Sequence, residues 1–184
     1  MSCKILVDID DTIENLCEAW CRWLSYLYDL DVDYTDVTDW NMELFFPTLT
    51  NEQIFAPLYN EKFWNTVEPK EDAIEYLKKL YEEGYDIYLC TSTDYKIIQM
   101  KYEIIIQKYF PFIKWNNVII AHNKQMIRAD FLIDDGVHNL IGGRYKKILY
   151  SAPHNENFKT FGTGIKRVNN WEEVYHEIKR HYFK

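Results

Sequence analysis

The sequence predicts an α/β protein with a parallel sheet, helices on both faces in a three-layer α/β/α sandwich, and a small helical cap. Three observations lead to this prediction. Short apolar runs rich in β-branched residues recur along the chain, stretches with helical periodicity separate them, and residues 29–47 show neither pattern. Strands that alternate with helices are typical of a parallel sheet, because each parallel pair needs a crossover connection.

The first strand is predicted around Ile5–Val7, an apolar run too short for a helix core. Apolar residues then recur at helical spacing and predict an amphipathic helix over about 15–28. The residues with this spacing are Trp20, Trp23, Leu24 and Leu27.

The cap is predicted to cover residues 15–68, leaving 1–14 and 69–184 as the α/β core. After the irregular stretch 29–47, two short helices are expected at 51–59 and 61–64. This segment therefore forms a small helical insertion between the first strand and the rest of the sheet.

The remainder of the core alternates between helices and strands. Pro69 and Gly84 are typical of a helix start and stop, and the following helix is expected to end before Pro111. A last helix is predicted from Trp171 to Ile178. The predicted elements are helices at 69–83 and 95–109, and strands at 85–90, 117–121, 131–133 and 147–150.

Composition limits the classes of partner. The 184 residues suffice for one domain with a substantial core, and 21 basic against 29 acidic residues give a net charge of −8, which disfavours a nucleic-acid polymer. Four cysteines lie inside predicted elements rather than in a loop framework, so we expect reduced thiols and a cytoplasmic protein. No signal peptide or membrane-length apolar run is present, so no membrane partner is expected.

Polar residues follow four of the predicted strands. In open α/β sheets the ligand binds beyond the carboxyl ends of the strands, so these residues should converge. Crowded carboxylates repel one another, which favours a hard divalent cation among them. The converging residues are Asp8 and Asp10, Thr91 and Ser92, Lys124, and Asp134 and Asp135.

These side-chain types suit phosphoryl transfer through an aspartyl-phosphate. One carboxylate attacks phosphorus, a second handles the proton, and a cation, a lysine and hydroxyl groups offset the phosphoryl charge. Asp8 and Asp10 are two residues apart on an extended chain, so both side chains project to the same side. Both can therefore face one phosphate group.

The order of these motifs resembles the haloacid dehalogenase-like (HAD) phosphatases, which have a Rossmann-like core. The resemblance is carried by DIDDT, LCTS and LIDD, and by Lys124 ten residues before Asp134. Together with the later pair His154-Asn155, these motifs are most similar to those of the 5′(3′)-deoxyribonucleotidases. The family pattern implies a Mg²⁺-dependent hydrolase acting on (deoxy)nucleoside 5′(3′)-monophosphates.

By this resemblance, Asp8 would be the nucleophile and Asp10 the general acid/base. Mg²⁺ would bind the Asp8 carboxylate, the Asp10 backbone carbonyl and one of the Asp134–Asp135 pair, with Asp135 favoured. Thr91, Ser92 and Lys124 would hold the phosphate. Leu16 and Gly136 depart from the family pattern, which leaves nucleobase preference open.

Aromatic residues of the cap are candidates for the substrate wall, because a planar base stacks well on an aromatic side chain. Trp40, Phe63 and Trp64 are favoured for this role, although they could equally fill the core of the cap. His122 and His154 are expected to be structural or peripheral, without a partner visible in the sequence.

Other functions stay open at this stage. A HAD phosphatase for another small phosphoester such as a sugar phosphate would differ only in the cap, and a non-catalytic Mg²⁺ or nucleotide binder would share the site. A signalling receiver domain is disfavoured, because no Asp ends the third predicted strand and a cap has no place in it. The choice of 5′ or 3′ phosphate and a possible homodimer are not decided.

Overall fold

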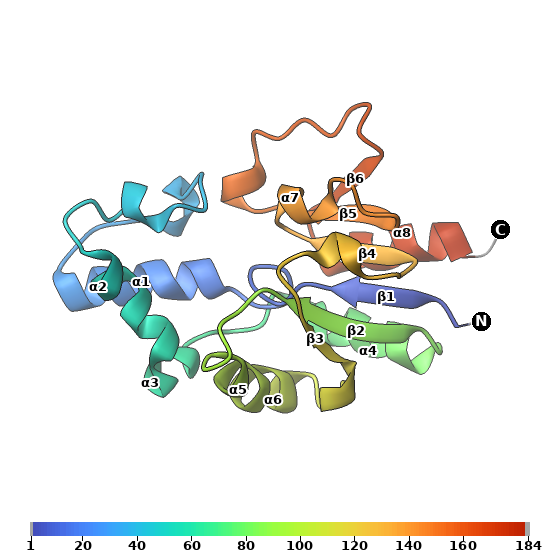
Figure 1. Cartoon of the computed structure of the whole chain (residues 1–184), viewed down its shortest axis with the longest axis horizontal. Coiled ribbons are helices and arrows are strands. Elements are labelled where there is room, and N and C mark those ends of the chain that lie inside the picture. Colours follow the sequence, from blue (N-terminus) through green and yellow to red (C-terminus); the bar gives the residue numbers. More distant parts are fainter. Residues whose placement is uncertain (1, 183–184) are drawn as a thin grey trace.

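The computed structural model describes residues 2–182, and its centre is a six-stranded sheet in which all neighbouring strands are parallel (Figure 1). The strand order is β3-β2-β1-β4-β5-β6, so the first strand lies in the middle. The strands are β1 (Lys4–Val7), β2 (Asp86–Thr91), β3 (Val118–Ile120), β4 (Phe131–Asp134), β5 (Lys146–Tyr150) and β6 (Ile165–Val168). The predicted fold class is confirmed.

The helices differ greatly in length. The long ones are α1 (Leu16–Tyr28), α4 (Ala73–Glu82) and α8 (Trp171–Tyr182). The short ones are α2 (Asn51–Phe55), α3 (Glu61–Trp64), α5 (Ile98–Met100), α6 (Gln107–Tyr109) and α7 (Val137–Leu140). A π-helical stretch, η4 (Lys101–Ile106), joins α5 to α6 without a break. Single 3₁₀ turns are η1 (Tyr34–Asp36), η2 (Met42–Leu44), η3 (Ala56–Tyr59), η5 (Trp115–Asn117), η6 (Lys124–Met126) and η7 (Pro153–Asn155).

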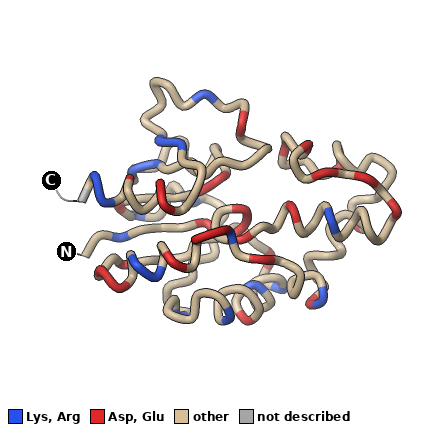
Figure 2. Tube along the Cα trace, turned by 180° about the vertical axis from the view of Figure 1, so that it is seen from behind, with Lys and Arg blue, Asp and Glu red and all other residues tan. Residues whose placement is uncertain are grey.

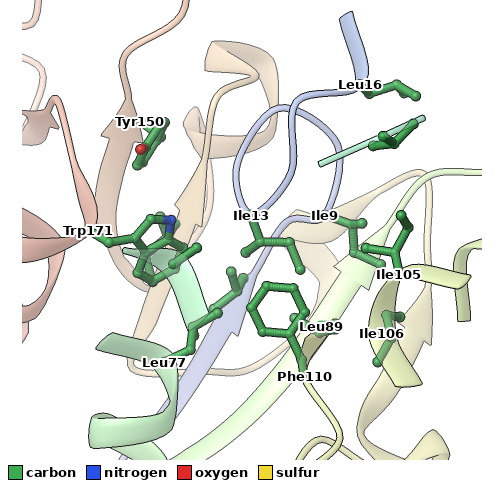
Figure 3. Packing of buried hydrophobic residues seen from close by; sticks show 14 of the residues in the cluster. Ile9, Ile13, Leu16, Leu77, Leu89, Ile105, Ile106, Phe110, Tyr150 and Trp171 are labelled. Atoms are coloured by element: carbon green, nitrogen blue, oxygen red, sulfur yellow. The ribbon is translucent and has the colours of Figure 1, made fainter. Parts of the chain in front are cut away.

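The two faces of the sheet bury different residues of the same strand, as the pleat requires. Ile5 and Val7 of β1 belong to a large core with α4, α8 and the helical segment 98–109, whereas Leu6 belongs to a smaller cluster with α7. Figure 3 shows Leu77, Phe110 and Trp171 gathered over the first face. The second face has a thinner cover, since α7 is only four residues long.

The predicted cap, residues 15–68, carries α1, α2 and α3 to one side of the sheet (Figure 1). Its two ends lie next to each other: Glu14 and Pro69 form an isolated antiparallel bridge, and the Asn15 amide donates to the Glu68 carbonyl at 2.9 Å. Cap and sheet share the large hydrophobic core, to which Trp64 of α3 belongs. The insertion therefore begins and ends at one point, immediately after the first strand's acidic turn.

The structure differs from the predicted elements in several places, and two of these differences concern the long helix α4 and the number of strands. The helix expected from Pro69 begins only at Ala73, because Pro69 is used in the bridge to Glu14 and Asp72 has a left-handed conformation, with φ of 59°. A sixth strand, β6, was not predicted. Its two middle residues, Lys166 and Arg167, break the apolar pattern, as is usual for a strand at the edge of a sheet.

The cysteines, the helices and the acidic residues bear on the expectations from composition. Cys3, Cys17, Cys21 and Cys90 are all buried and unpaired, as predicted. Within residues 2–182, none of the helices has the length and apolar character needed to cross a bilayer. Acidic residues without basic neighbours run along the loop after α1, residues 29–50, as Figure 2 shows.

Candidate active site

Three acidic side chains meet at the carboxyl edge of the sheet. Asp8 follows β1, Asp134 ends β4, and Asp135 comes directly after it. The Asp8 amide donates to the Ile133 carbonyl at 2.9 Å, which keeps the two strand ends level. One carboxylate oxygen from each of these three aspartates lies within 4.8 Å of the others, and all three residues are buried. The predicted convergence of strand ends therefore occurs.

Lys124 supplies a positive charge to this acidic cluster. It is 1% exposed on η6, and its Nζ contacts Asp8 Oδ1 and lies 2.7 Å from Asp134 Oδ2. Burial disfavours the ammonium, yet Asp8 and Asp134 outweigh burial and raise the pKa of Lys124 above its usual range. Lys124 is therefore charged and fixed between the two carboxylates.

The hydrogen-bond partners distinguish the two neighbouring aspartates. Asp134 accepts from Lys124, from the Gly136 amide at 2.8 Å and from Asn139 Nδ2 at 3.0 Å. Asp135 accepts from Thr12 Oγ1 at 3.0 Å through one oxygen only. Its other oxygen, Oδ2, is 2.9 Å from His154 Nε2, but the two are not aligned for a hydrogen bond. Asp135 thus keeps one oxygen without a hydrogen bond, whereas both oxygens of Asp134 accept hydrogen bonds.

The acidic cluster has more negative charge than Lys124 can compensate. Burial, opposed by Lys124 and reinforced by the neighbouring aspartates, raises the pKa of Asp8 well above its usual range. Burial, followed by the charge of Asp134, also raises the pKa of Asp135 well above its usual range. Buried carboxylates of this kind are stabilised in their charged form by a metal ion, and oxygen donors suit Mg²⁺. The residues present therefore fit a hard divalent cation.

Asp10 lies beside a second buried lysine. The Nζ of Lys101 is 2.5 Å from Asp10 Oδ2 and 3.3 Å from Thr91 Oγ1. Lys101 is 2% exposed, and its Nζ also lies 5.6 Å from the centre of the Trp64 ring. The proposed acid/base thus has its own cation, separate from Lys124.

Two further carboxyl groups lie buried behind this edge. Asp11, at a positive φ of 53°, accepts from the Cys17 amide at the start of α1, and burial raises the pKa of Asp11 to about 6. Glu14 is fully buried, and its carboxyl group shares a side-chain hydrogen bond with that of Asp10. Burial, followed by the charge of Asp10, raises the pKa of Glu14 well above its usual range. Burial therefore favours the neutral form of the Glu14 carboxyl group.

A cavity of about 320 Å³ opens over the acidic cluster and is lined by two chemically different sets of side chains. Charged and polar side chains form its floor: Asp8, Asp10, Ser92, Thr93, Lys101, Lys124, Asp134, Asp135, His138 and Asn139. Apolar side chains, mostly from the cap, form the rest of the lining: Leu16, Trp20, Trp40, Phe55, Leu58, Trp64 and Ile97. A small molecule with one anionic and one apolar, planar end fits this arrangement.

Some predicted site residues line the cavity and others do not. Ser92, Trp40 and Trp64 line it, as do the predicted aspartates and Lys124. Thr91 is fully buried, is not part of the lining, and accepts from Lys101. Phe63 is also buried outside the lining, with its ring 5.6 Å from that of Trp64. The roles of Thr91 in phosphate binding and of Phe63 in substrate binding stay predictions.

Both histidines have partners that the sequence did not reveal. Ser92 Oγ and His122 Nδ1 are 2.6 Å apart. The ring of His154 is 4.0 Å from that of Trp40, at an angle of 42°, and its Nε2 approaches Asp135. Burial lowers the pKa of His154, so this imidazole is neutral near pH 7. His154 thus connects the cap to the acidic cluster, and the structural or peripheral role expected for the two histidines stays a prediction.

Lys101 and Glu14 are not among the site residues predicted from the sequence. One signal was available for each: Lys101 lies four residues from both Ile97 and Ile105, on the apolar face of its helix, and Glu14 follows Ile13 inside a buried turn. A charged residue at a position that the pattern assigns to the core needs a compensating partner. Here the side chains of both residues interact with Asp10.

Comparisons with known proteins show the family to which this chain is similar. The model of the family described as 5′ nucleotidase, deoxy (Pyrimidine), cytosolic type C protein matches residues 2–182. A 5′(3′)-deoxyribonucleotidase of Bacillus subtilis is 32% identical over 95% of this chain and 97% of its own length. Another, from Clostridium acetobutylicum, is 31% identical over 91% of this chain and 90% of its own length.

Solved structures of low sequence identity share the fold. A HAD family hydrolase from Deinococcus radiodurans R1, with bound phosphate and sodium, superposes with a TM-score of 0.68 at 13% identity. The match covers 97% of this chain and 96% of the other. A haloacid dehalogenase-like hydrolase from Streptococcus pneumoniae superposes with a TM-score of 0.61 at 14% identity, over 96% and 98% of the two chains. The HAD-type architecture inferred from the sequence motifs is thereby confirmed.

Proposed function

Because this chain belongs to the family of 5′ nucleotidase, deoxy (Pyrimidine), cytosolic type C proteins and is a phosphatase, we propose that it hydrolyses (deoxy)nucleoside 5′(3′)-monophosphates through an aspartyl-phosphate on Asp8. The observation that carries the proposal is the pair of carboxyl groups, each with its own buried lysine, in a cavity that the cap lines with apolar side chains. Asp8 is held by Lys124, and Asp10 is held by Lys101.

We propose that the acidic cluster holds Mg²⁺ through the Asp8 carboxylate, the Asp10 backbone carbonyl and Asp135. Asp135 is favoured over Asp134 because one Asp135 oxygen has no hydrogen bond, whereas Lys124, Gly136 and Asn139 occupy Asp134. When bound, the cation would offset the negative charge of the phosphoryl oxygens next to Asp8. Lys124 and Ser92 would hold the remaining phosphate oxygens from the cavity floor.

In the first half of the reaction, a carboxylate oxygen of Asp8 attacks phosphorus and the bond from phosphorus to the nucleoside oxygen breaks. The departing oxygen takes the proton of the Asp10 carboxyl, which releases a neutral nucleoside and leaves Asp10 as a carboxylate. Lys124 contacts Asp8 and orients it for this attack.

In the second half, Asp10 takes a proton from a water molecule while the water oxygen attacks phosphorus. The bond from phosphorus to Asp8 breaks, inorganic phosphate is formed, and both carboxyl groups return to their starting states. Asp10 is suited to both halves, since it lines the cavity next to Asp8 without sharing its lysine.

The apolar part of the cavity lining supports a nucleoside as the leaving group. Trp40 and Trp64 offer aromatic surfaces, and a volume of about 320 Å³ suits one small molecule. The acidic loop over 29–50 would repel a polyanion. These features support a monomeric nucleotide as substrate and disfavour nucleic-acid polymers.

The nucleophile is tested by the variant Asp8→Asn, which removes the attacking oxygen without changing side-chain volume. We expect loss of phosphate release from deoxynucleoside monophosphates, with circular dichroism unchanged. The matched control is Asp36→Asn, an exposed cap residue, which should keep full activity. An active Asp8→Asn variant would refute the proposed chemistry.

The substrate class is tested with a panel of nucleoside monophosphates and sugar phosphates. We expect the highest kcat/KM for a deoxynucleoside monophosphate, because only a nucleoside fills the apolar part of the cavity. A preference for a sugar phosphate would contradict the nucleotide part of the proposal, while turnover that depends on Asp8 would still support the phosphatase chemistry.

A further inference from the structure

Lys101 is a buried cation that lies outside the group of converging strand-end residues. It is 2% exposed, and its Nζ joins Asp10 Oδ2 after β1, at 2.5 Å, to Thr91 Oγ1 at the end of β2, at 3.3 Å. It therefore connects the ends of two neighbouring strands at the floor of the cavity. A lysine is seldom buried without a specific partner, because removing its charge from water is costly.

The helix that carries Lys101 changes its geometry at this residue. The π-helical stretch begins at Lys101, and the Lys101 amide donates to the Ile97 carbonyl at 3.1 Å. Ile97 and Ile105, four residues before and after, are both buried. The lysine thus takes a core position, with Trp64 covering its ammonium group. Single π-helical turns of this kind are frequent at functional sites.

The two buried lysines of the site contact different carboxylates. Lys124 contacts Asp8 and Asp134, whereas Lys101 contacts Asp10. The other partner of the Asp10 carboxyl group is Glu14, a buried carboxyl group that shares a side-chain hydrogen bond with it and carries no positive charge. Lys101 is therefore the cation that fixes the direction of the Asp10 carboxyl group.

We propose that Lys101 is a positioning residue that holds Asp10 in the orientation needed to protonate the leaving oxygen. This inference rests on the proposed function, in which Asp10 gives its proton to the departing nucleoside. Lys101 does not itself transfer a proton or contact phosphorus. Its contribution lies in geometry, and misplacement of a catalytic group by about 1 Å can cost about 10²-fold in rate.

The proposal predicts a dependence on the leaving group. A nucleoside departs as a poor, strongly basic alkoxide unless it is protonated, whereas p-nitrophenolate departs readily without a proton. Misplacing Asp10 should therefore slow the cleavage of a nucleotide far more than the cleavage of p-nitrophenyl phosphate. A residue that only binds phosphate or supports the fold would affect both substrates alike.

The experiment compares kcat/KM for deoxyuridine 5′-monophosphate and p-nitrophenyl phosphate in wild type, Lys101→Met and Lys101→Gln. This parameter covers only the steps up to loss of the leaving group. The ratio of the two substrates within one preparation is independent of the fraction of folded enzyme. The matched control is Lys96→Met, an exposed lysine in the turn that precedes the same helix.

We expect Lys101→Met to lower the ratio of nucleotide to p-nitrophenyl phosphate turnover by about 10²-fold. Lys101→Gln, which keeps an N–H donor for Asp10, should lose less, and Lys96→Met should equal wild type. If Lys101→Met does not fold, the test uses the ratio of kcat/KM for the nucleotide to kcat/KM for p-nitrophenyl phosphate in Lys101→Gln. A ratio equal to that of wild type overturns the proposal.

Equal losses for both substrates would also overturn the proposal. Weaker inhibition by inorganic phosphate in the same variant would then assign Lys101 to phosphate binding, and unchanged inhibition would assign it to the fold. Failure of the proposed function looks different, because it would appear as retained activity in Asp8→Asn. An inactive Asp8→Asn with an unchanged ratio in Lys101→Met would refute the Lys101 role alone.

Discussion

Replacing Lys124 by methionine should destabilise the protein strongly in the absence of metal. Lys124 is 1% exposed and provides the ammonium group that contacts Asp8 and Asp134, so its removal leaves both carboxylates buried without a cation partner. Breaking a buried pair in this way costs about 3–5 kcal/mol. With a urea m value of about 2 kcal/mol/M, the midpoint of unfolding should fall by about 1.5–2.5 M.

The size of this loss should depend on pH and on Mg²⁺. Asp8 and Asp135 have raised pKa values in the folded protein, so their protonation contributes stability that is complete below the unfolded pKa of about 4 and is lost as pH rises through the folded pKa. Without Lys124 to oppose this shift, the variant should lose stability more steeply than wild type as the pH rises above the unfolded pKa of about 4. A cation bound to the acidic cluster should restore part of the lost stability. The gain should be about 2.7 kcal/mol when the free cation concentration is about 100 times the Kd.

Urea unfolding followed by circular dichroism, with EDTA or with Mg²⁺, measures each of these effects. Lys166→Met, an exposed residue on the edge strand β6, is the matched control and should change stability by less than about 0.5 kcal/mol. A Lys124→Met variant that is as stable as wild type in EDTA at neutral pH would refute the conclusion that Lys124 compensates buried carboxylates.

Three further predictions concern other parts of the molecule. Lys179 and Tyr175 lower the pKa of Glu83, so its carboxylate adds stability above the unfolded pKa of about 4.3 that is lost as pH falls. Glu83→Gln should therefore cost up to about 1 kcal/mol at neutral pH, and a deficit that persisted in acid would contradict this. Phe110→Ala, at a fully buried position, should cost about 3–5 kcal/mol in urea unfolding, and a small change would show that the core around it can collapse. Trp40→Ala should raise KM for a deoxynucleoside monophosphate about tenfold with kcat nearly unchanged, since base stacking is worth about 1–3 kcal/mol; an unchanged KM would limit Trp40 to its contact with His154.

The sequence by itself determined the sheet and the acidic floor of the site. Parallel strands place their carboxyl ends at one edge, so the order of Asp8, Lys124 and Asp134 along the chain was enough to predict their meeting. This inference needs only the strand positions and the topology rules. The edge strand β6 was missed because the charged pair at its centre hides the apolar pattern.

Only the tertiary structure decided which side chains surround that floor. Lys101, Glu14 and His154 come from a helix, a turn and a late loop, and their contacts with Asp10 and Asp135 depend on how these segments pack against the strand ends. Packing likewise placed Thr91 behind the cavity lining. Local periodicity specifies which face of a segment is buried. A buried charge, however, is compensated by a partner from a segment far away in the sequence, and no local pattern shows which segment that is.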